Sequence, residues 1–218
     1  MRLFVASLVA VGVASLASAN LLVNGSFENG DFQNNGGGAD SLALGSTAIT
    51  GWTTVSNELV WLNATNSYYV IPQDGSYSLD LTGYHDAYPY GGVSQTVSTV
   101  AGGKYHLSYY YGGLVLYSGN AGVEATAVDG STSAVLLDQV NYDTFADNSN
   151  TYNRVDLDFV ATGTSTIISF IGASPKGGTN YIGLDNVDLE GGSAVPEPAS
   201  MIAISAGIAA LVRRKRSS

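Results

Sequence analysis

The chain has 218 residues, a formal net charge of −10 and no cysteine. The excess of acidic residues disfavours nucleic-acid binding, which depends on clustered lysine and arginine. The lack of cysteine excludes disulfide bonds and a thiol nucleophile. Four of the eight basic residues lie in the last six positions, so the ends of the chain differ in character from its body.

The N-terminus has the parts of a secretory signal peptide. Arg2 gives a positive start, residues 3–16 are apolar, and Ala17-Ser18-Ala19 is a small-residue cleavage site. We expect residues 1–19 to form a signal helix that is removed after Ala19. An uncleaved N-terminal anchor is the alternative.

The body of the chain has the alternating pattern of β-strands. Apolar and polar residues alternate in residues 76–81, 104–111 and 154–161, and segments rich in Gly, Asn and Asp separate the apolar runs. Asp129-Gly130 predicts a hairpin turn. The pattern predicts an all-β fold, an antiparallel β-sandwich or barrel, in a single domain over residues 20–191.

Several segments of this domain carry a family resemblance. They read "LLVNGSFENGDF", "ITGWTTV", "DGSYSLDLTG" and, near the end, "IGLDNVDL". Together they resemble the galactose-binding-like jelly-roll superfamily. The pattern is most similar to xylanase-associated carbohydrate-binding modules and to plant cell-wall proteins with the same "NGSFE" opening. The resemblance implies a jelly roll that binds carbohydrate without catalysis.

The same resemblance implies a structural calcium ion (Ca²⁺). Modules of this kind hold the ion near the opening and closing motifs, where Glu28 and Asp185 stand in this chain, with Asp74 as a further candidate. Calcium takes six to eight oxygen ligands, and carboxylates are common among them. The alternative is that these carboxylates accept hydrogen bonds from backbone N–H groups.

Aromatic residues are the second group of candidates. Sugar rings pack on aromatic faces, and polar side chains bind their hydroxyl groups. The segment "GYHDAYPYGG" gathers tyrosines between Gly and Pro, and further aromatic residues stand upstream. The alternative is that tyrosine is common in β-sheets and in their cores. The predicted carbohydrate platform comprises Trp61, Tyr68, Tyr84, Asp86, Tyr88 and Tyr90, whereas Trp52 is expected in the core.

Catalysis is disfavoured. His85 and His106 lack metal-ligand spacing, and no G-x-S-x-G motif is present. Asp156 and Asp158 share the outward side of one predicted strand, whereas a glycosidase needs two carboxylates across a cleft. We interpret the chain as a non-enzyme, and a glycan-active hydrolase is the alternative that this pattern favours least.

The C-terminus combines a Pro-Glu-Pro triplet, a short apolar run and a basic end. The run from residue 199 to 212 is shorter than the roughly 20 residues that span a bilayer. A tail held temporarily in the membrane and a weak permanent anchor both fit this pattern. The key positions are Pro196, Glu197 and Pro198, then Arg213, Arg214, Lys215 and Arg216.

Residues 192–218 resemble a linker followed by the PEP-CTERM sorting signal of Gram-negative bacteria. The resemblance implies a sorting helix, transient association with the inner membrane, and cleavage by an exosortase. It also implies delivery to the cell surface, the outer membrane or an extracellular polysaccharide matrix. The predicted function is therefore glycan binding by an exported protein, and a structural biofilm-matrix protein without a sugar site is the rival.

Overall fold

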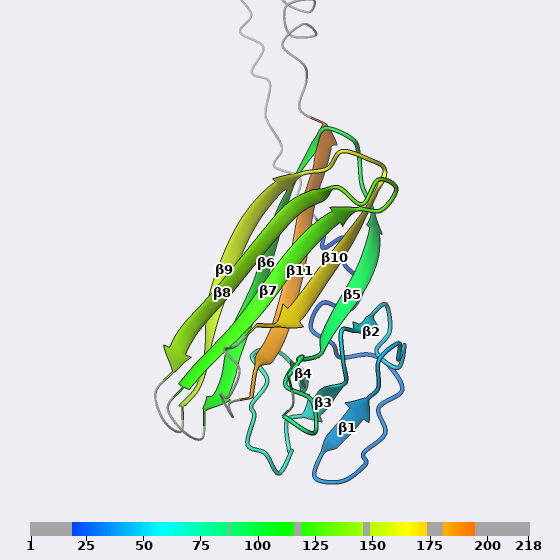
Figure 1. The fold of residues 1–218 in the computed structure, drawn as a ribbon. Helices are drawn as coiled ribbons and strands as arrows, with labels where there is room; N and C mark the ends of the chain where they lie inside the picture. Colours follow the sequence, from blue (N-terminus) through cyan, green and yellow to red (C-terminus); the bar gives the residue numbers. More distant parts are fainter. Residues whose placement is uncertain (1–18, 87, 116–118, 146–148, 174–180, 195–218) are drawn as a thin grey trace, which may run out of the picture.

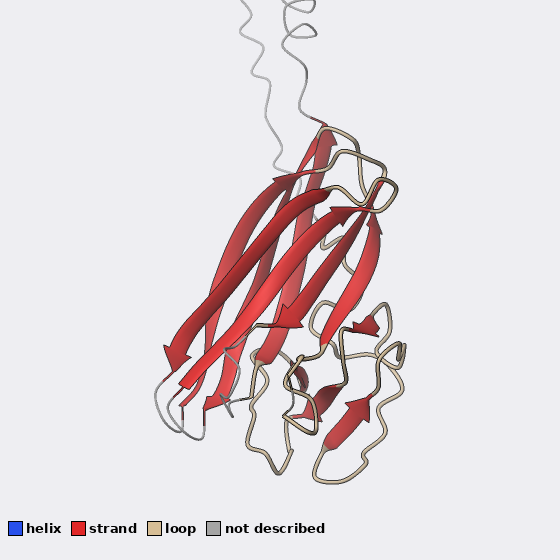
Figure 2. Ribbon diagram, viewed as in Figure 1, coloured by secondary structure: helices blue, strands red, loops and turns tan. Residues whose placement is uncertain are grey.

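The computed structural model describes residues 19–86, 88–115, 119–145, 149–173 and 181–194. These residues form strands, turns and loops, and no helix is found among them (Figure 2). The strands are β1 (Ala39–Leu42), β2 (Thr53–Val55), β3 (Leu59–Asn63), β4 (Tyr77–Asp80), β5 (Gly92–Ser98), β6 (Gly103–Val115), β7 (Gly119–Asp129), β8 (Val135–Phe145), β9 (Ser149–Val160), β10 (Ser165–Gly172) and β11 (Gly183–Ala194).

The strands form two antiparallel sheets that pack face to face, which confirms the predicted sandwich. One sheet has six strands in the order β1-β3-β4-β11-β6-β9, and the other has five in the order β2-β5-β10-β7-β8. Figure 1 shows the short strands β1 to β4 gathered at one end, while the long strands extend beyond them. β7 and β8 form the hairpin predicted at Asp129-Gly130, with residues 130–134 as its loop.

The core lies between the sheets because alternate residues of each strand point inward. On β6, Tyr105, Leu107, Tyr109 and Tyr111 are all buried, as the alternation predicts. The β7 residues opposite them across the core are small, and Ala121, Val123, Ala125 and Ala127 are fully buried. Large rings on one sheet therefore meet small side chains on the other.

Strand β3 is buried on both of its faces. Leu59 and Trp61 join the main core, whereas Val60 and Leu62 belong to a second, smaller cluster on the outer face of the six-stranded sheet. Because the second sheet packs against the inner face, another segment of the chain covers the outer face near β3. The covering segment positions the candidate site described below.

The two ends of the domain lie side by side. The Asn20 side chain donates a hydrogen bond to the Val187 carbonyl and accepts one from the Leu189 N–H. The Leu21 N–H also donates to the Leu189 carbonyl at 2.8 Å. Strand β11 continues to Ala194, three residues beyond the predicted boundary at 191.

Candidate functional site

The loop of residues 64–76, which joins β3 to β4, folds over the outer face of the six-stranded sheet. Asn66 organises it, because its side chain donates to the carbonyls of Asn63 and Val70 and accepts from the N–H groups of Tyr68 and Val70. Val70 is fully buried in the second cluster, where the half-buried rings of Tyr68 and Tyr181 pack. This 64–76 loop covers the outer side of β3.

Two residues from other strands hold the loop in place. Asn150 of β9 accepts a hydrogen bond from the Ile71 N–H and donates one to the Tyr69 carbonyl. Asp185 of β11 accepts from the N–H groups of Gln73 and Asp74 at 2.7 and 3.0 Å. Asp185 is fully buried, and burial raises its pKa to about 7 even though these hydrogen bonds oppose the rise.

The three predicted calcium ligands all gather around this loop. Glu28 Oε1 accepts the N–H groups of Ser76 and Tyr77, and Asp74 Oδ2 accepts the Ser26 hydroxyl. The Glu28 carboxyl also lies over Gly75, where a Cβ would be 2.5 Å from it. These carboxylates thus hold the turn by accepting backbone and hydroxyl hydrogens.

A shared calcium centre does not fit this arrangement. The atoms that face Glu28 and Asp185 are N–H donors, whereas calcium requires surrounding oxygens. Across the described residues, no group of three or more His, Cys, Asp or Glu side chains is placed to hold a metal ion. Calcium binding stays a prediction, and the hydrogen bonds give these residues a structural role.

Beside the 64–76 loop lies a hollow bordered by aromatic side chains, which we call the aromatic hollow. It has two recesses, and Tyr68 and Tyr84 line both of them. The larger recess has a volume of about 240 Å³ and is lined by Asn35, Gly36, Ala39, Ser41, Tyr68 and Tyr84. The smaller has about 50 Å³ and is lined by Val60, Leu62, Tyr68, Asp80, Gly83, Tyr84, Asp86 and Tyr181.

The predicted platform residues divide into three groups. Tyr84 is 60% exposed and Tyr68 half-buried, and with exposed Asp86 they line the hollow. Tyr88 is also exposed but is not among the lining residues. The other two predictions, Trp61 and Tyr90, are wrong, because these side chains are only 1% and 2% exposed.

Trp61 is buried because β3 directs its odd-numbered residues into the core. Its ring packs against Phe32 and Tyr77 with centroids 5.2 Å away in both cases, and its indole N–H donates to the Phe27 carbonyl. Tyr90 lies just before β5 and close to Gly172. A Cβ placed on Gly172 would lie only 2.7 Å from the Cβ of Tyr90. Trp52 is buried as expected.

Sequence reasoning missed Asn35, Ser41, Asp80 and Tyr181, which also line the hollow. A usable signal was the unbroken apolar run of residues 59–62, which is typical of a strand buried on both faces. It indicates that a loop covers the outer face. It does not indicate which residues border the gap that the loop leaves.

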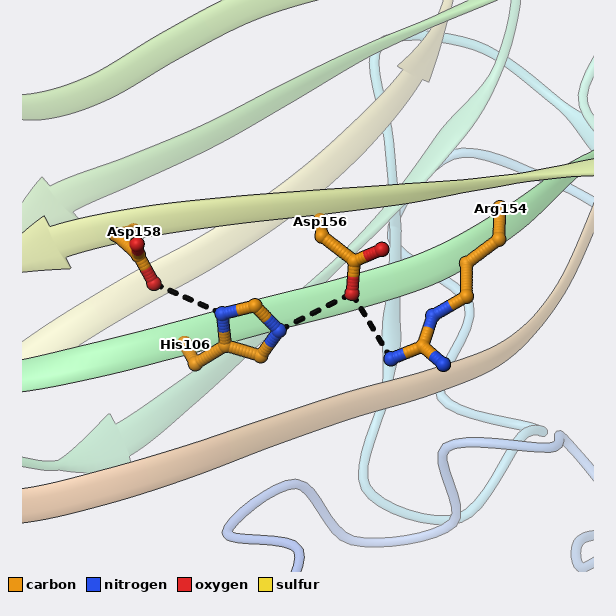
Figure 3. A network of polar contacts seen from close by, with 4 residues as sticks. All are labelled: His106, Arg154, Asp156 and Asp158. Atoms are coloured by element: carbon orange, nitrogen blue, oxygen red, sulfur yellow. Dashed lines mark hydrogen bonds and ion pairs between the residues drawn. The ribbon is translucent and has the colours of Figure 1, made fainter.

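A second constellation lies on the same outer face, along β6 and β9 (Figure 3). His106 Nδ1 is 2.8 Å from Asp158, its Nε2 is 3.1 Å from Asp156, and the Arg154 guanidinium donates to Asp156 at 2.8 Å. The contact with Asp158, followed by that with Asp156, raises the pKa of His106. We call these four residues the His106 network.

The His106 network matches the predicted solvated strand face. Asp156 and Asp158 lie on neighbouring outward positions of one strand, and both are exposed. A hollow of about 430 Å³ adjoins them, lined by Lys104, Tyr105, His106, Asp158, Phe159, Val160, Glu190 and Gly191. The rings of Tyr105 and Phe159 are buried and stack on each other, so this hollow offers no free aromatic face.

The predictions for the two ends fall largely outside the described residues. This applies to Ala17 and to the sorting-signal positions from Pro196 to Arg216, whereas Ala19 is described and exposed. In the part of the chain that the structure describes, no helix is long and apolar enough to span a membrane.

Comparison with known proteins identifies both parts of the chain. Residues 20–181 match the family described as "protein of unknown function (DUF642)". The chain belongs to the DUF642 family. A PEP-CTERM protein-sorting motif matches residues 194–216 of this DUF642 protein, which indicates export to the cell surface and implies processing by an exosortase.

The chain is also similar to part of a very large protein. Halomucin from Haloquadratum walsbyi is 33% identical over 184 residues. The match covers 82% of this chain, but the chain spans only 2% of the length of halomucin.

A solved structure with a TM-score of 0.50 supports the jelly-roll fold. The N-terminal CBM22-1–CBM22-2 tandem domain of Paenibacillus barcinonensis Xyn10C is 22% identical, with a TM-score of 0.50, over 84% of this chain and 49% of that one. The CBM22-1 xylan-binding domain of Xyn10C from the same organism is 18% identical, with a TM-score of 0.44, over 84% of this chain and all of that domain.

Proposed function

We propose that this exported protein binds carbohydrate without catalysis, at the aromatic hollow. The observation that carries the proposal is the exposed ring of Tyr84 and the half-buried ring of Tyr68, which both line the two recesses. Asn35, Ser41 and Asp86 supply amide, hydroxyl and carboxylate groups around them. Aromatic faces for sugar C–H groups and polar groups for hydroxyls are the elements of a sugar site.

The His106 network is a weaker candidate for the binding site. Both ring nitrogens of His106 already contact carboxylates, and Arg154 already donates to Asp156. A ligand there would have to break these contacts before it gained its own. Tyr84, by contrast, has most of its surface free for a ligand.

The geometry of the acidic residues supports a non-catalytic role. Asp80 and Asp86 both line the smaller recess, but Asp80 is only 2% exposed and its Oδ1 already accepts three hydrogen bonds, as expected for a structural carboxyl group. A glycosidase places two carboxylates on either side of the glycosidic bond, at separations of roughly 5 Å or more. Asp156 and Asp158 do not face each other across a cleft, because they stand on one strand.

We propose that a Gram-negative bacterium exports this protein to its cell surface, its outer membrane or its extracellular polysaccharide matrix. Without residues 1–19 and 195–218 the chain keeps three basic and seventeen acidic residues, for a net charge near −14. Such a charge favours a soluble exported domain. The tail would enter the inner membrane transiently and be cut by an exosortase near Pro-Glu-Pro. Intact-mass measurement of surface-released protein tests this, and retention of Arg213 to Ser218 would contradict it.

A glycan-binding screen of the purified protein tests the main proposal. Tyr84→Ala should weaken binding of any glycan hit by about tenfold or more, because stacking on a ring contributes on the order of 1 kcal/mol or more. Tyr142→Ala is the matched control, since Tyr142 is equally exposed at 60% but stands on β8 of the other sheet. Equal binding by both variants would remove the aromatic hollow as the site.

A structural matrix protein is the second candidate, and strand β8 favours it. β8 ends the five-stranded sheet and carries exposed Val135, Val140 and Tyr142. Apolar edge strands favour self-association. An empty glycan screen together with concentration-dependent assembly in light scattering would support this candidate, and turnover of a polysaccharide panel would support a hydrolase.

A further inference from the structure

The smaller recess of the aromatic hollow has an apolar lining with a buried carboxyl group. Val60 and Leu62 contribute aliphatic side chains from β3, and Tyr68, Tyr84 and Tyr181 contribute rings. Asp80 of β4 also lines the recess, although only 2% of its surface is exposed. A buried carboxyl group in such surroundings needs hydrogen-bond partners for both of its oxygens.

The protein supplies partners to one of the two oxygens. Asp80 Oδ1 accepts the Thr82 N–H at 3.0 Å, the Thr82 hydroxyl at 2.7 Å and the Ile182 N–H at 3.1 Å. The three hydrogen bonds that other described residues donate to the Asp80 carboxyl group all end on Oδ1. Oδ2 is therefore the oxygen that remains for a ligand in the recess.

The volumes of the two recesses limit the shape of that ligand. A cavity needs about 10–15 Å³ of this kind of volume to hold one water molecule. By that measure, the recess of about 50 Å³ holds only a few non-hydrogen atoms, while the recess of about 240 Å³ is large enough for a sugar ring. The ligand group that reaches Asp80 is therefore small, and it is attached to a bulkier body.

We propose that the hollow recognises a hexose with a free hydroxymethyl group. The sugar ring lies in the larger recess between Tyr68 and Tyr84, and the CH₂OH group enters the smaller one. Its methylene contacts Val60 and Leu62, and its hydroxyl hydrogen-bonds Asp80 Oδ2. This inference rests on the proposed function and adds the substrate class to it.

A site with these two recesses should reject three kinds of sugar. A 6-deoxy hexose carries a methyl group there, which fits the space but leaves Oδ2 without a partner. A pentopyranose such as xylose has no group to fill the smaller recess. A hexose linked through its 6-position cannot enter. Because an unpaired buried acceptor is costly, the 6-deoxy analogue should bind about tenfold or more weakly than its parent sugar.

The test uses small glycosides and the whole protein. Methyl glycosides of glucose, galactose and mannose are titrated alongside their 6-deoxy counterparts and methyl xyloside, with binding followed by NMR. We expect at least one hexoside to bind, and its 6-deoxy counterpart to bind about tenfold or more weakly. Equal affinities within a bound pair would overturn this inference while leaving the proposed function standing. Binding of the xyloside but of none of the hexosides would overturn this inference alone, whereas binding of no glycoside, even when presented on larger glycans, would overturn both.

Asp80→Asn sharpens the test. The amide keeps an acceptor for Thr82 and Ile182 but replaces Oδ2 with an N–H₂ donor. The charge-assisted hydrogen bond from the sugar hydroxyl is then lost, so the hexoside should bind several-fold more weakly. Ser78→Ala is the control, because Ser78 is also buried on β4 but does not line the hollow. An unchanged hexoside affinity in folded Asp80→Asn would overturn the role of Asp80. If this variant does not fold, the paired glycosides on the parent protein still decide the question.

Discussion

The aromatic hollow and the His106 network lie on the same outer face of the six-stranded sheet, yet they use their side chains in opposite ways. Asp80 beside the hollow pairs with Gly183 at the start of β11, whereas His106 pairs with Glu190 near its end. In the network, charged side chains contact one another on an open strand surface. At the hollow, the 64–76 loop covers part of the sheet. The rings of Tyr68 and Tyr84 and the carboxyl group of Asp80 line the space beside this loop.

The difference shows that a dense group of polar residues is a weak guide to a binding site. The His106 network is rich in charge, but its members already serve as partners for each other. The hollow has fewer charged groups, but Tyr84 is largely exposed and the hydrogen bonds that other described residues donate to Asp80 all end on Oδ1. Groups without partners are the ones that a ligand can satisfy.

The largest expected effect is a difference in stability between two variants, one that removes the core ring of Trp61 and one that removes the surface ring of Tyr84. Trp61→Ala should lower the free energy of unfolding by about 3–5 kcal/mol, because it removes a large buried side chain. Tyr84→Ala should change it by less than about 0.5 kcal/mol. Urea unfolding of both variants provides the measurement. A similar large loss for Tyr84→Ala would mean that its ring belongs to the core and not to a platform.

The next effect concerns how the 64–76 loop is held. Asp185→Asn should lower stability by about 1–3 kcal/mol, because an amide N–H₂ would face backbone N–H groups that need an acceptor. We expect this loss with or without chelator. If calcium binds instead, a hundredfold excess over its Kd should stabilise metal-stripped protein by about 2.7 kcal/mol, and Glu28→Gln should abolish that gain. Melting curves with added calcium or chelator distinguish the two outcomes.

The third effect is a dependence of stability on pH. Burial raises the pKa of Asp80 and Asp185 to about 7 from the ordinary value near 4, so the native state binds more protons than the unfolded state in this range. Their contribution is complete below about pH 4 and is lost as the pH rises through about 7. We expect a loss of about 2–3 kcal/mol for each of the two groups between pH 5 and 8, because one pKa unit corresponds to about 1.4 kcal/mol and pH 5 lies about two units below the native pKa.

Urea unfolding at several pH values measures this loss, and two variants identify its source. Asp80→Asn should flatten part of the slope, because an amide does not titrate. His106 has a raised pKa as well and adds a loss in the same direction above about pH 6.5, so His106→Gln provides the comparison. A stability that rises steadily from pH 5 to 8 would contradict the assignment of both buried carboxyl groups.

The smallest effect is expected at the His106 network. Arg154→Ala should cost less than about 1 kcal/mol, since both partners of the ion pair are exposed and solvent screens the attraction. The loss should shrink further in high salt. Glycan binding should not change. A large drop in glycan affinity for this variant would move the binding site from the hollow to this end of the sheet.

The sequence predicted the strands well where one face of the sheet meets the core. The alternation in β6 and β9 indicated the inward residues correctly, because side chains in a strand point to opposite faces in turn. Strand β10 follows the same rule. Only alternate residues of β10 are buried, because no further layer covers its outer face.

The aromatic residues show the limit of this reasoning. Trp61, Tyr84 and Tyr90 have similar chemistry and similarly polar neighbours in the sequence, so composition alone placed them on one platform. Trp61 is buried because the odd-numbered residues of β3 point into the core. Tyr90 is buried because the chain returns to the sandwich there, just before β5. Both are properties of strand pairing and not of the local sequence.

By itself, the sequence determined the class of fold, the export signals and the acidic surface, because these depend on periodicity, short motifs and composition. The tertiary structure decided which residues share a site. Asn35, Ser41, Tyr68, Asp80 and Tyr181 come from separate segments, and only the folding of the 64–76 loop over β3 brings them around one hollow. The physical reason is that this loop must bury Val70 and pair its backbone with Asn150 and Asp185, partners far away in the chain.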